Sequence, residues 1–459
     1  MFSILGNATF RHLFGAQVFS LMGSGLATVA LALLAFDLAG DRAGTVLGTA
    51  FALKMVAYVG ISPVVGAYAA RFPRRGFLVG LDLCRAAMVC LLPFVDAIWQ
   101  VYVLVFLFQS FSAAFTPTFQ ATIPDVLPDE EEYTRALSLS RLAYDLESVL
   151  SPVFAGLLLS VVSFHWLFAG TGVGFLISAL LVVTAALPAA KKALDQQDTL
   201  RKRLGKGFRI YMKTPRLKGL LGMSFAVSAA GSIVLVNTVV LVQGQLGADQ
   251  TILTLFMGVY GAGSMVVAFT IPRLLRTVHD RKVMLAGIPM LIVGLLLATE
   301  IDSVVTGLPV WFLLGVAGSV ILTPSGRLLA RSAHPEDRPA IYAAHFALSH
   351  AGWLITYPLA GWAGVTFGLQ ETMLIMAALV LVGGVAALWF WPREFGRELE
   401  HEHPAHHHGH MHVHDEHHDH KHEGWEGPEP HVHPHHHEAV RHVHDFVIDD
   451  HHPAWPTRL

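Results

Sequence analysis

Charged side chains are scarce in this chain of 459 residues, since Asp, Glu, Lys and Arg together make up only 14% of it. Hydrophobic residues make up 53%, and the mean hydropathy is +0.52. Soluble domains usually carry about 25% charged residues. This composition therefore excludes a soluble enzyme and places the chain in a lipid bilayer.

Cysteine is also nearly absent, and the two that occur, Cys84 and Cys90, fall in one apolar stretch. Their spacing corresponds to about one and two-thirds helical turns, which puts the two thiols on different faces. They cannot form a disulfide with each other, and we interpret them as small packing residues.

A phosphate-binding loop of the Gly-x-x-x-x-Gly-Lys-Ser/Thr kind is missing as well. Gly205-Lys206-Gly207 is too short to serve, and no soluble region is large enough for a nucleotide-binding domain. The sequence therefore predicts no ATP hydrolysis, no enzymatic activity, no catalytic cofactor, and no nucleotide or nucleic-acid partner. Transport would be driven by an ion gradient, with protons expected, or by the gradient of the substrate itself.

What the chain does contain is a series of twelve apolar stretches, each long enough to cross a bilayer as a helix of about 20 residues. The first residues lack the pattern of a cleavable signal peptide, so we expect the first stretch to remain as a helix. The predicted spans are 11–36, 44–70, 76–96, 99–121, 135–162, 165–188, 217–243, 251–275, 281–300, 307–330, 338–366 and 370–391.

The positions of Lys and Arg predict the orientation, because these residues are retained on the cytoplasmic side during insertion. The even-numbered connections are rich in them, while the other loops hold almost none apart from Arg42. We therefore expect a multi-pass protein of the plasma (inner) membrane with both termini in the cytoplasm. The basic connections contain Arg71, Arg74 and Arg75, then residues 191–218, 273–282 and 327–338.

An internal repeat divides the chain. A shift of 207 residues aligns Thr116-Pro117 with Thr323-Pro324 and Arg74-Arg75 with Arg281-Lys282. This relation predicts two parallel halves with a substrate path between them near the bilayer midplane. The predicted domains are an N-terminal six-helix bundle (1–188), a basic cytoplasmic linker (189–216), a C-terminal six-helix bundle (217–395) and a His-rich cytoplasmic tail (396–459).

Residues 66–75 read Gly-Ala-Tyr-Ala-Ala-Arg-Phe-Pro-Arg-Arg. This segment resembles the loop signature of the major facilitator superfamily, a Gly followed by an Asp-Arg pair and further bases. Ala70 stands where the signature usually has Asp, and we expect Asp82 with Arg85 to replace part of that contact. The resemblance implies an all-α fold of twelve transmembrane helices that transports by alternating access.

A second set of residues carries a narrower resemblance. Residues 117–128, Arg135 and the segment 151–156 are similar to the branch that contains macrolide and siderophore exporters. The resemblance to the superfamily as a whole covers residues 1–395.

The tail holds 21 of the 27 histidines of the chain, between His401 and His452. In an extended chain alternate side chains share a face, so His-x-His presents two imidazoles to one ion. Imidazole suits Ni, Zn, Cu(II) and Co, and carboxylates such as Glu402 and Asp419 can add oxygen ligands. The candidate metal ligands are His401, His403, His406, His407, His408, His410, His412, His414, His417, His418, His420, His422, His431, His433, His435, His436, His437, His442 and His444.

Low apolar content predicts that this tail is disordered, and a merely solvated tail or a purification tag are the plain alternatives to metal binding. No histidine run exceeds three, and acidic residues are interspersed, which argues against a tag. A major facilitator body with such a tail is similar to the NreB-type nickel-resistance exporters. That resemblance implies efflux of Ni(II), with Co(II) or Zn(II) as further substrates.

Ionisable residues inside membrane spans are costly and usually serve a partner or a task. The candidates for transport or proton coupling are Lys54, Asp145, Glu147, His345 and His350. Asp145 and Glu147 lie about 200° apart around a helix, and the two histidines lie about 140° apart. Neither pair is therefore well placed to bind one ion together. For Glu147 the alternative is a buried partner for Lys54, and for the histidines it is hydrogen-bonded structure.

A second group of charges lies near the cytoplasmic surface, and we interpret it as gating or structural. Asp82 and Arg85 are three residues apart, a spacing at which they can approach each other on one helix face. Arg71, Arg74 and Arg75 complete this group.

The sequence leaves three functions open. The leading hypothesis is secondary-active export of a divalent transition metal, most of all nickel, by proton antiport, with the tail collecting ions beside the inward opening. The first alternative is efflux of an organic drug or siderophore, with a regulatory tail. The second is a membrane-anchored metal sensor or store.

Overall fold

The computed structural model describes residues 2–68, 73–127, 129–187, 200–332 and 338–391, the tail segments 398–403, 406–412, 431–437 and 440–445, and residues 447, 448 and 455. Within these ranges some side chains are outside the description, including those of residues 62–68, 145 and 201–204 and those of the four tail strands.

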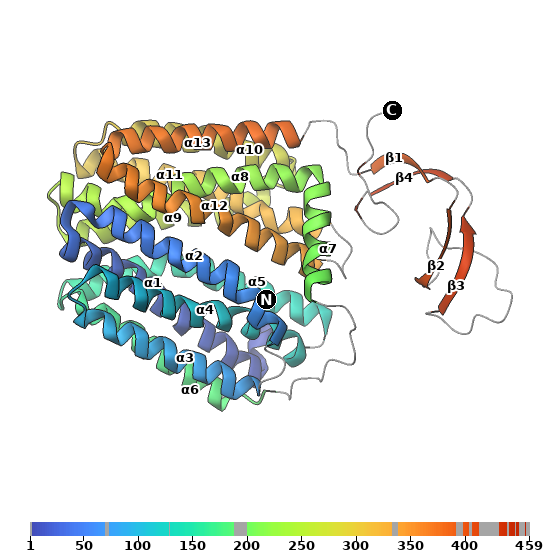
Figure 1. Cartoon of the computed structure of the whole chain (residues 1–459), viewed down its shortest axis with the longest axis horizontal. Helices are drawn as coiled ribbons and strands as arrows, with labels where there is room; N and C mark the ends of the chain where they lie inside the picture. The colour runs from blue at the N-terminus through green and yellow to red at the C-terminus, as the bar shows by residue number, and fades with distance from the viewer. Residues whose placement is uncertain are drawn as a thin grey trace.

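Each of the twelve predicted spans contains a helix (Figure 1). Nine continuous stretches of the described residues are long and apolar enough to cross a membrane, the first of which, Ala8–Ile61, reaches through α1 into α2. The helices are α1 (Ala8–Ala39), α2 (Ala43–Tyr68), α3 (Arg74–Leu91), α4 (Ile98–Val126), α5 (Glu130–Leu159), α6 (His165–Thr184), α8 (Pro215–Ser232), α9 (Gln250–Leu274), α10 (Asp280–Ala298), α11 (Val304–Ala330), α12 (Arg338–Thr366) and α13 (Leu369–Phe390).

Short polar side chains fix where several helices begin. The side chains of Asn7, Asp129, Asp249 and Ser303 each accept a hydrogen bond from a backbone N–H in the first turn of α1, α5, α9 and α11. These bonds satisfy N–H groups that have no partner inside the helix. Gly40, with φ of 52°, ends α1 in a left-handed conformation that leads into the short 3₁₀ helix η2 (Gly40–Arg42).

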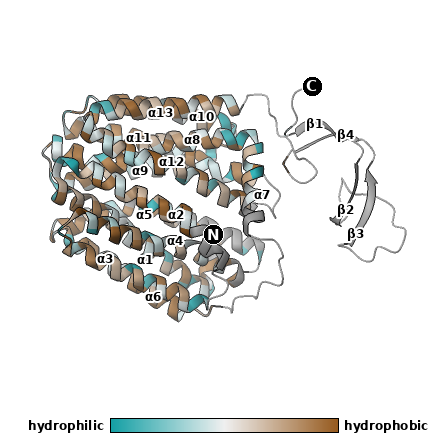
Figure 2. Cartoon of the chain, viewed as in Figure 1, coloured by the Kyte–Doolittle hydropathy of each residue, from teal (hydrophilic) through white to brown (hydrophobic). Residues whose placement is uncertain are grey.

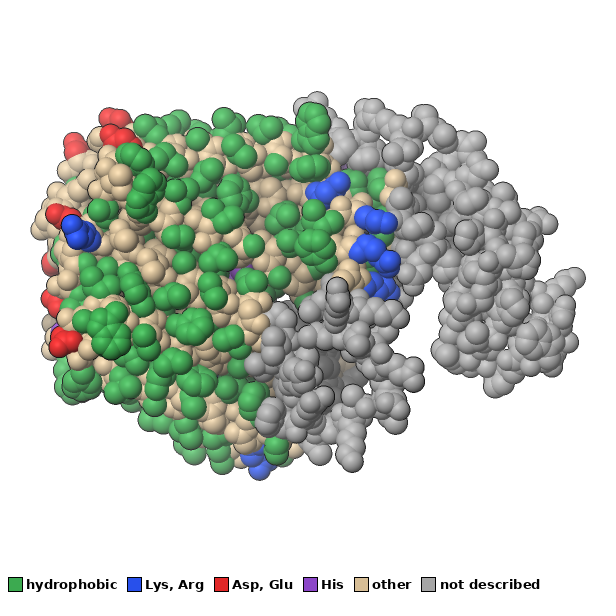
Figure 3. All heavy atoms as spheres, viewed as in Figure 1, with side chains coloured by type: hydrophobic (Ala, Val, Ile, Leu, Met, Phe, Trp, Pro, Cys, Tyr) green, Lys and Arg blue, Asp and Glu red, His purple; other side chains and the backbone are tan. Residues whose placement is uncertain are grey.

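The lateral surface of the bundle is apolar, as a lipid-facing surface must be. Figures 2 and 3 show apolar residues along the flank, and large hydrophobic side chains such as Phe94 and Trp389 are exposed. On the face shown in Figure 3, Asp and Glu side chains gather at one end, and Lys and Arg gather mainly at the other, beside α7. We call the end that holds η2 the far end and the end that holds η1 (Phe2–Gly6) and α7 the tail end.

The helices form two groups. In the first group, α1 packs against α5 and α6, α3 against α4 and α6, and α2 against α4. In the second group, α8 packs against α12 and α13, α9 against α11, and α10 against α11 and α13. The contacts α2–α12 and α5–α9 join the groups.

Two hydrogen bonds repeat the same connection in each group. Nη2 of Arg75, in the first turn of α3, donates to the carbonyl of Ala185 after α6 over 2.7 Å. Nε of Arg281, in the first turn of α10, donates to the carbonyl of Trp391 after α13 over 2.8 Å. The local repeat therefore equates Arg75 with Arg281, one residue away from the shift of 207 that the Thr-Pro pairs indicate.

Small residues let the two groups approach closely at the far end, as is common between membrane helices. A Cβ added to Gly48 of α2 would lie 2.5 Å from the carbonyl oxygen of Tyr357 on α12, and one added to Gly361 would overlap the carbonyl oxygen of Gly44. The hydroxyl of Thr45 donates to the carbonyl of Gly361 over 3.1 Å. These contacts hold α2 and α12 together near the ends of the helices at η2.

The segment predicted as a linker contains a further helix that the search for membrane spans did not predict. Residues Leu200–Lys213 form this helix, α7, which lies across the tail end (Figure 1). This helix is too polar to span a membrane, but one face is buried against α12. Tyr211 is fully buried, and a Cβ on Gly207 would overlap the carbonyl of Ala340. A search for uniformly apolar spans overlooks such an amphipathic helix.

The tail also differs from the disordered segment that its composition predicts. Strand β1 (Glu398–His403) pairs antiparallel with β4 (Val440–Asp445), and β2 (His406–His412) pairs antiparallel with β3 (His431–His437). Pairing brings His401 opposite His442 and His408 opposite His435 in register. Alternation of histidine with Val and other residues suits extended backbone, although an isolated two-stranded sheet is marginally stable in water.

Candidate transport cavity

A cavity of about 560 Å³ lies among the helices, lined by side chains from α1 to α5 and from α12. Most of its lining comes from the first helix group, and the second group contributes Phe346, His350, Trp353 and Tyr357 of α12. Sites for small organic molecules commonly have volumes of about 300–1,000 Å³. The cavity is therefore of the size of a molecule rather than of a single ion.

Aromatic rings form one part of its wall. The ring centroids of Phe51 and Tyr357 lie 5.2 Å apart, and those of Trp353 and Tyr357 lie 4.9 Å apart. Phe108 and Phe115 of α4 add further rings from the first group. Such a wall presents flat apolar faces to an organic ligand.

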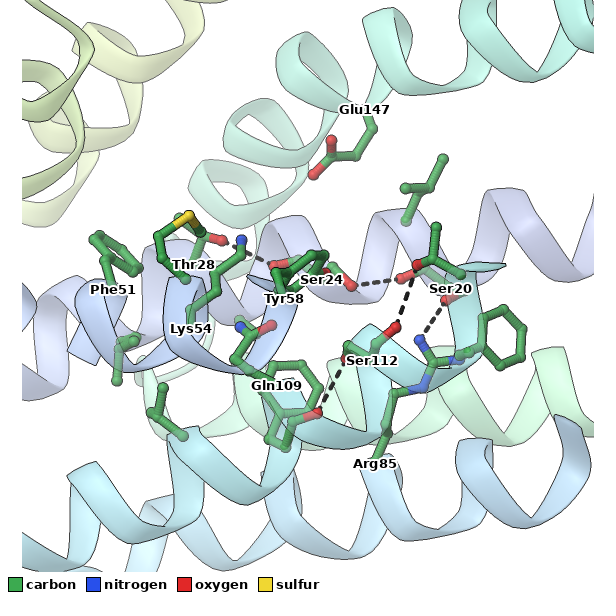
Figure 4. A pocket seen from close by; sticks show the side chains of 18 of the residues that line it. Ser20, Ser24, Thr28, Phe51, Lys54, Tyr58, Arg85, Gln109, Ser112 and Glu147 are labelled. Carbon is green, nitrogen blue, oxygen red and sulfur yellow. Dashed lines mark hydrogen bonds between the residues drawn. The ribbon is translucent and has the colours of Figure 1, made fainter. Parts of the chain in front are cut away.

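A polar strip on α1 forms another part. Gln17, Ser20, Ser24 and Thr28 recur three or four residues apart, so they share one helix face, and all four line the cavity. Figure 4 shows Ser20, Ser24 and Thr28. The hydroxyls of Ser24 and Thr28 donate to backbone carbonyls one turn earlier, and the amide oxygen of Gln17 accepts from Ser140 over 2.9 Å.

Lys54 of α2 and Glu147 of α5 bring opposite charges to the same cavity from different walls (Figure 4). Nζ of Lys54 lies 5.7 Å from the centroid of the Tyr58 ring. The Glu147 carboxylate packs over Gly25 of α1, since a Cβ there would lie 2.8 Å from Oε1. Both side chains line the cavity, and among the described residues no ion pair links them.

Asp82 and Arg85 form a buried ion pair on α3, with exposed fractions of 0% and 3%. Asp82 Oδ2 accepts a hydrogen bond from Ser178 of α6 over 2.8 Å, and Nη1 of Arg85 donates to Ser20 of α1 over 3.2 Å. The guanidinium also lies 4.0 Å from the centroid of Phe115. The pair therefore ties α3 to α1 and α6, deeper in the bundle than a surface gate, while Arg85 touches the cavity.

His345 and His350 occupy different environments on α12. Nδ1 of His345 lies 2.9 Å from the hydroxyl of Tyr211, so α7 holds this ring, and it is not among the residues that line the cavity. Nδ1 of His350 lies 2.7 Å from the carbonyl of Phe346 and its ring stacks on Phe346 and on Tyr58. His350 lines the cavity, so the two rings do not serve one site there.

Several predicted site residues lie outside the described part of the chain. These are Arg71, the side chain of Asp145, the side chains of the histidines in β1 to β4, and His414, His417, His418, His420 and His422. Arg74 and Arg75 are described, at the beginning of α3. In the described residues no group of three or more His, Cys, Asp or Glu side chains could hold a metal ion.

The sequence did not single out Tyr58, Ser20 or the aromatic wall. The serines and threonines of α1 carry a helical spacing that could have indicated a polar face in an apolar span. The aromatic wall carries no such signal, because its rings come from three different helices and look like ordinary lipid-facing or core residues in the sequence.

Known proteins similar to this chain are membrane transporters and efflux proteins. The chain is 25% identical over 393 residues to an uncharacterized MFS-type transporter, YfiS, of Bacillus subtilis, covering 81% of this chain and 92% of that protein. It is 26% identical over 194 residues to the macrolide efflux protein A of Streptococcus pyogenes, but this match covers 41% of the chain and 47% of that protein.

Solved structures share the fold at low sequence identity. The nucleoside transporter NupG superposes with a TM-score of 0.65 at 14% identity, over 84% of this chain and all of that one. A bacterial homolog of the human lysosomal transporter Spinster gives a TM-score of 0.65 at 13% identity, over 83% of this chain and 96% of that one. The family description Major Facilitator Superfamily matches residues 13–296 and 220–427. With its all-helical polytopic fold and its cavity between helix groups, the chain belongs to the Major Facilitator Superfamily, and it is a secondary transporter, not an enzyme.

Proposed function

We propose that this transporter exports a divalent transition metal from the cytoplasm, with nickel as the first candidate and cobalt and zinc as further substrates. The observation that carries the proposal is the attachment of the histidine-rich tail. Helix α13 ends at Phe390 at the tail end of the bundle, so a segment with 21 histidines is tethered there. A tether of this kind raises the local concentration of bound ions beside the transport path.

The two helix groups are proposed to be the moving halves, residues 1–188 and 217–395, joined by the linker 189–216. Contacts between α2 and α12 close the path at the far end, at Gly48 and Gly361. The basic side chains beside α7 favour a cytoplasmic tail end, and with it cytoplasmic termini. The described conformation then corresponds to an inward-facing state that loads from the cytoplasm.

Glu147 is proposed as the carrier of the coupling proton. It is a carboxylate in the cavity wall without an ion-pair partner among the described residues, so it can gain and lose a proton during the cycle. Lys54, on another wall, balances its charge when the carboxylate is ionised. Asp145, whose side chain lies outside the described set, stays a second candidate.

Metal accumulation by cells with and without the chain tests the proposal. Cells that produce the intact protein should accumulate less radioactive nickel and tolerate more of it than cells without the protein. Cells that produce Glu147→Gln should accumulate as much nickel as cells without the protein. Cells that produce Glu132→Gln, the same change at an exposed position of the same helix, should accumulate as little as cells with the intact protein. Equal accumulation with and without the protein, for nickel, cobalt and zinc, would refute metal export.

Efflux of an organic molecule is the second candidate, and the aromatic wall favours it. A partial match to macrolide efflux proteins is consistent with it. If metal tolerance never depends on the chain while resistance to an amphipathic drug does, this candidate replaces metal export. The third candidate, a membrane-anchored sensor or store, predicts neither effect.

A further inference from the structure

We infer that the metal crosses the cavity as a complex with a small carboxylate-bearing organic ligand rather than as a bare ion. This inference rests on the metal export proposed above and names the form in which the metal is carried.

The number of protein ligands argues against a bare ion. Transition metals such as zinc are held by about four ligands at about 2.0–2.3 Å. Among the lining side chains that the structure describes, a set that does not include Asp145, the only imidazole is that of His350 and the only carboxylate is that of Glu147. With one or two protein ligands, most coordination positions of the metal are left open. A cavity of about 560 Å³ has room for a second molecule that fills them.

The charges argue in the same direction. Lys54 and Arg85 both line the cavity, and each repels a dication. Asp82 neutralises Arg85, but Lys54 has no ion-pair partner among the described side chains. Glu147 lines another wall of the same cavity, but its carboxylate makes no ion pair with Lys54 there, so the ammonium group can pair with the carboxylate of an incoming ligand. A chelate that is neutral or negative overall removes the repulsion that the free dication would meet.

The setting of His350 suits a metal that arrives partly coordinated. Its Nδ1 lies 2.7 Å from the carbonyl of Phe346, so in the neutral ring that nitrogen carries the proton and Nε2 carries the lone pair. A hydrogen bond from the other ring nitrogen to a carbonyl is the usual support of a metal-binding histidine. Stacking on Phe346, at 3.9 Å between centroids, and on Tyr58, at 5.9 Å, holds the ring in place. Among the described residues no hydrogen bond is made to Nε2, which leaves it open to a ligand.

The remaining wall accounts for the organic part. Phe51, Trp353 and Tyr357 offer ring faces, and Gln109 and the hydroxyls of Ser24 and Thr28 offer polar contacts. A volume of about 560 Å³ accommodates a metal together with one or two small acids. A bare ion would leave these surfaces without a role.

Inside-out membrane vesicles that contain the full chain, with an imposed proton gradient, test the inference. Uptake of radioactive nickel is measured in a weakly coordinating buffer, with excess citrate, and with excess histidine. Uptake of labelled citrate and labelled histidine is measured with and without nickel. Vesicles without the chain give the background for each arm.

We expect nickel and one of the labelled acids to enter together, several-fold faster than nickel alone at equal total nickel. Nickel uptake that follows the free ion and falls when either acid is added would overturn the inference while leaving metal export intact. Entry of an acid at the same rate without nickel, or of nickel without any labelled acid, would also overturn it. No nickel uptake in any arm would refute metal export itself.

Two substitutions add a second readout. His350→Gln and Lys54→Met should each raise the half-saturating concentration of the nickel complex several-fold, while His279→Gln, an exposed histidine at the beginning of α10, should leave it unchanged. If both cavity variants are present in the membrane and transport the complex with unchanged half-saturation, the complex does not bind where we infer.

Discussion

The hydroxyl of Tyr211 lies 2.9 Å from Nδ1 of His345, and this contact joins α7 to α12. Tyr211 is fully buried, and its ring stacks on that of His345 with 5.8 Å between centroids. α7 is thereby held to α12, the one helix of the second group that lines the described cavity. His345, which the sequence offered as a candidate for transport or proton coupling, thus contacts the linker helix and is not among the described lining residues of the cavity.

Replacing Tyr211 with Phe should weaken this anchor without removing transport. A net loss of about 1 kcal/mol is expected for one buried hydrogen bond. Thermal unfolding of the purified protein should shift to lower temperature, while proton-driven nickel uptake remains. Complete loss of uptake by a protein that reaches the membrane would show that α7 takes part in the cycle.

The burial of Tyr211 also predicts that the stability of the folded protein depends on pH. Burial raises the pKa of the Tyr211 phenol above its ordinary value, so in the unfolded chain the phenol loses its proton at lower pH than in the folded protein. Its contribution to stability is present below about pH 10 and is lost as the pH rises further. Between about pH 8 and about pH 11, the unfolding temperature of Tyr211→Phe should therefore fall less than that of the intact protein. An equal fall in both proteins would contradict the assignment.

Neutralising Glu147 should abolish uptake driven by a proton gradient, and removing Lys54 as well should not restore it. Among the described residues no ion pair joins these two side chains, so Glu147→Gln does not deprive Lys54 of an ion-pair partner. Removing Lys54 as well therefore repairs no broken ion pair. The measurement is nickel uptake by vesicles that contain Glu147→Gln, Lys54→Met or both. Recovery of both expression and uptake in the double variant would identify a structural pair instead of a coupling carboxylate.

Breaking the buried pair on α3 should cost stability rather than specificity. Asp82→Asn leaves the guanidinium of Arg85 in the interior without its charge partner, a change that typically costs about 3–5 kcal/mol. The variant should be poorly retained in the membrane. Normal amounts of a protein with normal unfolding temperature would show that the pair is dispensable for folding and free to act as a gate.

A larger side chain at Gly361 should force α2 and α12 apart at the far end. A Cβ there overlaps the carbonyl of Gly44, and overpacking of this kind costs about 1–3 kcal/mol. Gly361→Val should therefore disfavour the described conformation and slow uptake. The control is Gly60→Val on α2, where an added Cβ meets nothing within 4 Å. Equal uptake by both variants would show that this contact does not govern the cycle.

The sequence predicted the membrane helices well, because each one is long, apolar and bounded by turn residues. The span predicted at 338–366 coincides with α12, and that predicted at 165–188 begins where α6 begins. Helix α5 begins at Glu130, whereas the predicted span begins at residue 135. The first turn contains three consecutive glutamates, whose low hydropathy is typical of a loop.

The cavity could be predicted only in part. Lys54, Glu147, Arg85 and His350 stood out because charge is costly in a membrane, and all four line it. Their relations did not follow from the sequence. Lys54 and Glu147 are on different helices, and whether they pair depends on helix rotation and separation, which apolar periodicity does not fix. The contact of His345 with Tyr211 could not be predicted either, because Tyr211 lies on α7, a helix that a search for apolar spans does not detect.

The most direct test of the account separates the body from the tail. Inside-out vesicles that contain residues 1–399 alone should still take up nickel under a proton gradient at high nickel, but should need more nickel than the full chain, because the tail only raises the local concentration. The full chain should lose this advantage as the pH of the medium falls below about 6.5, since protons then compete for the imidazoles. If the shortened protein is present at normal levels and takes up no nickel at any concentration, the helical body does not carry the metal and the account is wrong.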